Sequence, residues 1–269
     1  MAIANSLGGI SRVLLLAGLA AACQPDLVVG VWSCPVGPRE PDDAGVLESF
    51  MGPVQTPWST NFEHGLCDLY VALGYCYVPE DAAYEVDTTF AHSGQKSLAF
   101  TLDTTSDAGR QARCVREGVL PDDAYYGAWY YFPEQRSEID NWNILHFQGG
   151  EPGSQLHNLW DVTVEPDDAS GKLKLYMRGY GPLRPFHQAD PPTTIPIGSW
   201  FHIEFRFKRA ADATGRVTLY QDGKVLADAK DIVTDDSSWG QWYFGNLANS
   251  LTPAESTLYV DDISIRPAP

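Results

Sequence analysis

The chain has 269 residues, of which 44% are hydrophobic, 12% aromatic and 20% charged. This composition is typical of a folded globular protein and excludes a largely disordered one, and the length suits one large all-β domain or two small ones. The formal net charge of −17 would repel phosphate over most of the surface. We therefore expect no nucleic-acid partner.

The first 22 residues form a predicted signal peptide. They carry Arg12, an apolar run from Val13 and then small residues up to Cys23. The run is too short for a spanning helix. The end of this segment resembles a bacterial lipoprotein signal, which implies export, lipidation of Cys23 and attachment to the outer membrane or cell surface through the lipid alone. Ala20 stands where such signals usually have a larger residue, so ordinary signal-peptide cleavage stays open.

Residues 23–57 are rich in Pro, Gly and Asp and show no sustained hydrophobic period. Such composition is typical of a linker, so we expect a tether here and a folded domain over residues 58–269.

Four cysteines remain when Cys23 is set aside, an even number that suits disulfides in an exported protein. We favour a local Cys67–Cys76 bridge and, by remainder, Cys34–Cys114, although the other pairings stay open. A zinc site is less favoured because no CxxC pair accompanies these residues.

Short alternating runs dominate the chain from Trp58 onward. Phe201, Ile203, Phe205 and Phe207 share one face of a predicted strand at 199–208, and further strands are expected at 96–103, 125–132, 143–148, 159–165, 172–179, 215–223, 241–247 and 257–265. Asp222-Gly223 predicts a hairpin turn. This pattern indicates an all-β fold, a two-sheet antiparallel β-sandwich.

Polar residues on three of these strands would form a basic stripe if the strands were neighbours in one sheet. They are His146, Gln148, Lys174, Tyr176, Arg178, His202, Arg206 and Lys208. The alternative is that they are solvated residues scattered over different faces of the sandwich.

Several landmarks resemble the concanavalin A-like jelly rolls. They are FEHG at 62–65, HSGQKSLAF at 92–100, GSWFHIEFRF at 198–207, YQDGKVL at 220–226 and YVDDISI at 259–265. This superfamily includes carbohydrate-binding modules, laminarinase-like domains and polysaccharide lyases of the heparin- and glucuronan-lyase kind. The resemblance implies a jelly roll over roughly residues 60–266 but leaves the activity open.

Within that superfamily, the two-glutamate pattern of the glucanases is missing, and HFQ at 146–148 reverses the QxH order of the alginate lyases. The heparin- and glucuronan-lyase-like members use His and Tyr to remove the C5 proton of a uronate, while Gln, Lys or Arg neutralises its carboxylate. The resemblance thus implies catalytic roles for His146, Gln148 and Tyr176, with substrate contacts from Lys174, Arg178, His202 and Arg206. A structural role for His146 stays open.

Further candidate substrate contacts are Trp129, Tyr131, Trp239, Gln241 and Tyr243, because sugar faces stack on aromatic rings. Alternation places about half of the rings in the core, which is the competing interpretation. In many jelly-roll binding modules an early Glu and a late Asp hold a structural calcium. Glu63, Asp261 and Asp262 match that pattern, and a β-bulge at 261–262 could direct a carboxylate to the ion. The alternative is a solvated acidic pair on an edge strand.

The sequence thus predicts an exported protein that binds a polysaccharide, with anionic, uronate-containing polymers favoured, and leaves open whether it cleaves them by β-elimination. The alternative is a non-enzymatic structural or adhesive surface lipoprotein with a lectin-like jelly roll.

Overall fold

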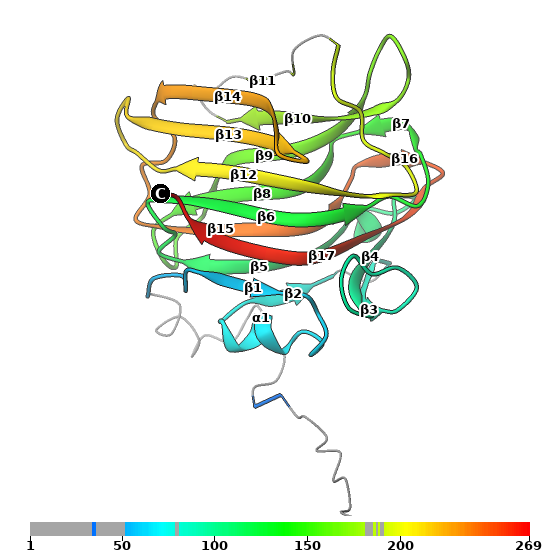
Figure 1. Cartoon of the computed structure of the whole chain (residues 1–269), viewed down its shortest axis with the longest axis horizontal. Coiled ribbons are helices and arrows are strands. Elements are labelled where there is room, and N and C mark those ends of the chain that lie inside the picture. Colours follow the sequence, from blue (N-terminus) through cyan, green and yellow to red (C-terminus); the bar gives the residue numbers. More distant parts are fainter. Residues whose placement is uncertain (1–33, 36–51, 79–80, 181–184, 187, 189–190) are drawn as a thin grey trace, which may run out of the picture. The chain divides into compact units, whose positions relative to one another are not determined.

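Two antiparallel sheets pack face to face in a computed structural model, which describes residues 34–35, 52–78, 81–180, 185–186, 188 and 191–269 (Figure 1). The signal peptide, Cys23 and most of the predicted tether lie outside the described residues. No helix in the described ranges is long and apolar enough to cross a membrane. The predicted two-sheet antiparallel β-sandwich is confirmed.

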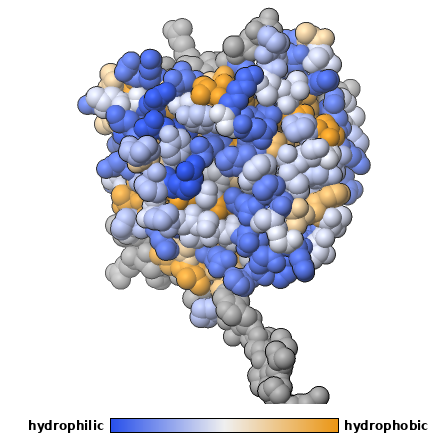
Figure 2. Space-filling view, viewed as in Figure 1, coloured by the Kyte–Doolittle hydropathy of each residue, from blue (hydrophilic) through white to orange (hydrophobic). Residues whose placement is uncertain are grey.

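The front sheet in Figure 1 contains eight strands among the described residues, in the order β14-β13-β12-β6-β17-β4-β3, with β1 paired to β17. Their bounds are β1 Trp58–Thr60, β3 Ala83–Asp87, β4 Ser97–Asp103, β6 Asp123–Tyr131, β12 Trp200–Lys208, β13 Gly215–Gln221, β14 Lys224–Ile232 and β17 Glu255–Pro267. We call this the front sheet. Hydrophilic residues cover most of its outer face, and apolar residues there are scattered in small groups (Figure 2).

The back sheet contains seven strands in the described part of the chain, in the order β11-β10-β9-β8-β15-β5-β2. Their bounds are β2 Tyr75–Tyr77, β5 Gln111–Gly118, β8 Trp142–Gly150, β9 His157–Pro166, β10 Leu173–Gly179, β11 Pro185–Phe186 and β15 Trp239–Leu247. A short pair, β7 Ser137–Asp140 and β16 Ser250–Thr252, the helix α1 Cys67–Val71 and the 3-10 turn Ala108–Arg110 complete the described elements.

Alternation within the strands creates the core between the two sheets. On β12, Phe201, Ile203, Phe205 and Phe207 are fully buried, while the residues between them are partly exposed. Phe147 of the back sheet packs against Phe205 and Phe207 with ring centroids 5.1 and 4.9 Å apart. Truncating a ring in such a core to Ala costs about 3–5 kcal/mol, so these contacts fix how the sheets face each other.

The hairpin between β13 and β14 turns at Asp222-Gly223, as predicted, with φ values of 49° and 75°. Two consecutive positive φ values are the geometry that favours Asp-Gly in a two-residue turn.

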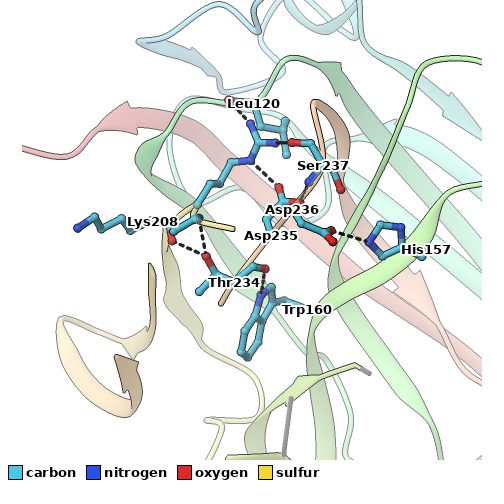
Figure 3. Close-up of polar contacts among 10 residues, drawn as sticks. Leu120, His157, Trp160, Lys208, Thr234, Asp235, Asp236 and Ser237 are labelled. Atoms are coloured by element: carbon cyan, nitrogen blue, oxygen red, sulfur yellow. Dashed lines mark hydrogen bonds and ion pairs between the residues drawn. The ribbon is translucent and has the colours of Figure 1, made fainter. Parts of the chain in front are cut away.

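A buried arginine network closes one end of the sandwich. Arg209, which follows β12, donates to the Asp235 carboxylate at 2.6 Å and to the carbonyls of Leu120 and Ser237 at 2.6 and 2.7 Å. Thr234 next to Asp235 donates to the Lys208 carbonyl and accepts the indole N–H of Trp160 on its own carbonyl (Figure 3). The 234–237 segment is therefore hydrogen-bonded to residues of both sheets.

The cysteines pair differently from our preferred assignment. The bridges are Cys34–Cys67 and Cys76–Cys114. Cys76 and Cys114 are cross-strand partners on β2 and β5, so the sheet register brings them together. Cys67 begins α1, and the short helix separates it from Cys76.

The folded part begins earlier than the predicted boundary at residue 58. Val54 is buried in the core, its N–H donates to the Val119 carbonyl at 2.9 Å, and Pro53 forms a β-bridge with Val119. The end of the predicted tether therefore packs on the domain.

Candidate functional site

Six strands of the back sheet carry one continuous line of cross-strand partners over its outer face. We call this line the central row, and it consists of Tyr75, Val115, Tyr243, His146, Asp161 and Arg178 on β2, β5, β15, β8, β9 and β10. Side chains directly opposite each other on one face lie close enough to interact. The row therefore assembles a site from residues more than 160 positions apart in the sequence.

His146 stands in the middle of this row and is fixed by Asp161. Its Nδ1 hydrogen-bonds to Asp161 Oδ1, and the Tyr180 hydroxyl donates to Asp161 Oδ2. A carboxylate only accepts hydrogen bonds, so Nδ1 is the donor of this pair, and Nε2 is the ring nitrogen that Asp161 leaves uncontacted. Asp161 is 1% exposed and His146 5%. Burying a carboxylate without hydrogen bonds costs free energy, and the hydrogen bonds from His146 and Tyr180 offset that cost for Asp161.

Tyr243 is the aromatic neighbour of His146. The two residues are register partners, and their ring centroids lie 5.4 Å apart. Burial raises the pKa of the Tyr243 phenol, which therefore keeps its proton at neutral pH. Its hydroxyl contacts the side-chain amides of both Gln241 and Gln148. Both contacts join the hydroxyl to an amide oxygen, and a hydroxyl has one proton, so it donates to one of the two oxygens at a time.

Gln148 and Gln241 form the next line of partners, beside the central row. Gln148 also hydrogen-bonds to Asn158 at 2.8 Å, and Gln241 donates to the Glu117 carboxylate at 2.5 Å. Gln148 is partly exposed, whereas Gln241 is buried. The amides therefore hold the Tyr243 hydroxyl in place and leave part of Gln148 accessible to a ligand.

Cations lie on both sides of His146. Arg178 is exposed at one end of the central row, with its guanidinium 5.0 Å from the ring centroid of Tyr180. Arg113 on β5 lies on the other side, 4.7 and 5.6 Å from the ring centroids of Tyr243 and Tyr77. Neither guanidinium forms an ion pair within the described residues, so both charges are available to an anionic ligand.

The remaining back-sheet candidates are less well placed. Lys174 lies 3.7 Å from Glu165 and 3.9 Å from Asp167, which offset its charge. Tyr176 is the partner of Thr163, so Tyr243 and not Tyr176 lies opposite His146. Trp239 precedes Gln241 on β15 and is buried at 7% exposure.

Four candidates lie on the wrong sheet to join His146. Trp129 and Tyr131 are on β6, and His202 and Arg206 are on β12, all in the front sheet with Lys208. Arg206 forms a two-pronged ion pair with Asp123 at 3.0 and 2.8 Å, and His202 packs beside Trp129. The prediction of a single basic stripe is therefore wrong, because only its members on β8 and β10 share a face.

The three acidic residues of the calcium prediction gather around residues 92–96. Asp261 accepts the N–H groups of His92 and Ser93, Asp262 contacts the side chains of the same two residues, and Glu63 accepts N–H groups of Gln95 and Lys96. The predicted bulge is present between Asp261 and Ser264. No group of three or more His, Cys, Asp or Glu side chains in the described ranges is arranged to hold a metal. These carboxylates already bind protein donors, which does not fit a ready calcium site, and calcium stays a prediction.

The residues of the site that were not predicted are Tyr75 and Val115 of the central row and, around it, Asp161, Tyr180, Arg113 and Glu117 among others. Asp161 interrupts an apolar run on β9. A single acidic residue in such a run was the sequence feature that could have indicated a buried, hydrogen-bonded carboxylate. Arg113 and Glu117 lie on β5 Gln111–Gly118, a strand that the sequence pattern had not indicated.

The fold and the site together define a jelly-roll sandwich of the kind found among the polysaccharide lyases. A model of the polysaccharide lyase family matches residues 52–264, and the chain belongs to this family.

Solved structures with the same fold include an endo-β-1,4-glucuronan lyase from the fungus Trichoderma reesei, at 15% identity and a TM-score of 0.59 over 72% of this chain and 90% of that one. The alginate lyase Aly36B with an alginate trisaccharide shows 15% identity and a TM-score of 0.59 over 80% of this chain and 100% of that one. An alginate lyase from Aplysia kurodai shows 12% identity and a TM-score of 0.53, again over 80% and 100%. No curated protein matches the chain.

Proposed function

We propose that this protein cleaves a uronate-containing polysaccharide by β-elimination on the outer face of the back sheet. The observation that carries the proposal is the placement of the His146–Asp161 pair directly opposite Tyr243, with a guanidinium on either side. The family membership and the glucuronan and alginate lyases among the similar structures support the same reaction class.

The proposed reaction needs a base, an acid and a cation. Nε2 of His146 takes the C5 proton of the uronate, and Arg178 or Arg113 stabilises the negative charge that spreads onto the carboxylate. The bond from C4 to the glycosidic oxygen then breaks, and that oxygen takes the phenolic proton of Tyr243. The products are a saturated reducing end and a chain end with a C4–C5 double bond, and solvent returns the protons to their original groups.

Incubation of the purified chain with glucuronan and with alginate tests this proposal, using ultraviolet absorbance to follow the unsaturated product. A neutral β-glucan is the matched negative substrate because it has no carboxylate to acidify C5. Absorbance that rises with either polyuronate and not with the neutral glucan supports the proposal. The absence of unsaturated ends with every polyuronate tried, despite measurable binding, contradicts it.

A second candidate is glycan binding without cleavage. The observation that favours it is the 5% exposure of His146, which leaves little of the ring open to a substrate in this conformation. Isothermal titration with the same polymers, run beside the absorbance assay, separates binding from elimination.

Export, lipid attachment at Cys23 and calcium at Glu63, Asp261 and Asp262 stay predictions. Membrane fractionation of cells that express the chain or its Cys23→Ser variant tests the anchor. A chelator should lower the unfolding temperature and added Ca²⁺ should restore it if a calcium ion is bound. The Glu63→Gln variant should then show no response to the chelator.

A further inference from the structure

An arginine is buried inside the sandwich, directly beneath the candidate site. Arg116 is on β5 next to Glu117, but its side chain points inward and is 1% exposed. Its Nε and Nη1 atoms are buried without a hydrogen-bond partner, and no ion pair joins Arg116 to another described residue. A full positive charge thus stands in the core without a carboxylate.

Two more unpaired donors belong to the same cluster. Trp242 is the cross-strand partner of Arg116, and its ring centroid is 5.0 Å from that of Tyr126 on the facing sheet. The Tyr126 hydroxyl and the Trp242 indole N–H are both buried without a partner. Three fully buried side chains, two from the back sheet and one from the front sheet, therefore carry four unsatisfied polar atoms in the core.

Known contacts do not compensate this charge. Burial lowers the pKa of Arg116 to about 10, which still leaves the guanidinium protonated at neutral pH. The ring centroid of Trp58 lies 4.2 Å from the guanidinium carbon, but a cation–π contact stabilises a cation by less than its burial costs. The buried carboxylate of Asp235 is bound by Arg209.

We propose that a small monovalent anion of the halide class binds between the sheets, held by Arg116, Tyr126 and Trp242. All three side chains offer donors, and an anion accepts from every one of them. A water molecule would need acceptors for its own two protons, and in this set only the Tyr126 oxygen can accept. One guanidinium sets the charge of the ligand at minus one.

The anion would brace the strands that carry the candidate site. Trp242 lies between Gln241 and Tyr243 on β15, and Arg116 precedes Glu117 on β5. Each strand thus presents one side chain to the anion and its neighbours to the outer face. The proposed binding is independent of the glycan reaction and is testable without activity.

Thermal unfolding in sodium bromide and in sodium gluconate, at equal ionic strength, tests the proposal. The midpoint is expected to rise with each increase in bromide and not with gluconate, because a ligand that binds only the folded state stabilises it. Tyr126→Phe and Trp242→Phe should each weaken this dependence, and Arg116→Met should abolish it. Tyr130→Phe is the matched control, since Tyr130 is a buried tyrosine of the same strand whose hydroxyl bonds to the Ile144 carbonyl. That variant should keep the full response to bromide.

A crystal grown in bromide gives the direct measurement. An anomalous peak in contact with Arg116, Tyr126 and Trp242 would support the site, even if Arg116→Met does not fold. Two results together would overturn the proposal. One is an equal unfolding midpoint in bromide and in gluconate, and the other is a water molecule, with no anomalous peak, between Arg116, Tyr126 and Trp242.

Discussion

Tyr243 and His146 are direct cross-strand partners on β15 and β8, with ring centroids 5.4 Å apart. The pair places a phenol that burial keeps protonated beside an imidazole whose Nδ1 is bound by Asp161. A potential acid and a potential base are thus adjacent, on strands nearly one hundred residues apart in the chain. The following predictions depend on this arrangement.

His146→Ala should reduce the formation of unsaturated product by about a hundredfold to ten-thousandfold, the usual contribution of a general base. Absorbance with the better polyuronate checks this. His202→Ala is the matched control because His202 lies on the front sheet, and its activity should stay near that of the unchanged protein. Equal losses in the two variants would point to general damage to the fold.

Asp161→Asn should lower kcat by about a hundredfold or more while the chain remains folded. The amide has nearly the shape of the carboxylate, but it neither selects the Nδ1–H form of His146 nor stabilises the imidazolium that forms. Circular dichroism checks the fold, and steady-state kinetics measures kcat. Asp228→Asn, which loosens an ion pair with Arg216 on the front sheet, should leave kcat unchanged.

Arg178→Ala and Arg113→Ala should each raise KM for an anionic polymer, and binding of the unchanged protein should weaken as salt increases. Titrations at low and high sodium chloride measure both effects. Arg216→Ala is the control, since its guanidinium is already paired with Asp228 on the other sheet. Affinity that is insensitive to salt and to both substitutions would rule out these arginines as carboxylate ligands.

The raised pKa of Tyr243 predicts a pH dependence. Because the folded protein holds this proton more tightly than the unfolded chain does, its contribution to stability is complete below about pH 10 and is lost as pH rises through the folded-state pKa. Activity should therefore show no loss from phenol ionisation below about pH 10. Ultraviolet difference titration of the protein and of Tyr243→Phe checks the midpoint, which for Tyr243 should exceed that of a free phenol.

Arg209→Met should destabilise the fold by about 3–5 kcal/mol, because it leaves the buried Asp235 carboxylate without its cation (Figure 3). Urea unfolding measures the change. The double variant Arg209→Met with Asp235→Leu should recover part of the loss, since it removes both charges. If the double variant is no more stable than the single one, the carbonyl contacts of Arg209 dominate instead.

Strict alternation made the long strands predictable. β12 and β10 each place their apolar residues at every second position, and the structure confirms both strands. The two-residue strand β11 and the three-residue strands β1 and β2 are too short to show a period. Alternation also states which residues share a face of one strand, but not which sheet the strand joins. That is why His146 could be placed beside Gln148, while His202 was grouped with them and lies on the other sheet.

Long-range pairing explains the other differences. The partner of Cys76 is set by the register of β2 against β5, 38 residues away, and sequence spacing favoured the nearer Cys67. The hydrogen bonds from His146 and Tyr180 to Asp161 form only when β9 and the segment after β10 lie beside His146, and sequence spacing does not indicate this.

The central row spans six strands that join parts of the chain from Tyr75 to Tyr243, so no contiguous fragment shorter than that interval contains it. Long sequence separations of this kind slow folding, because distant segments must meet before their contacts stabilise anything. If the proposed reaction is correct, a nascent chain that ends before β15 would therefore lack part of the site. The complete row would form only after β15 has paired with both β5 and β8.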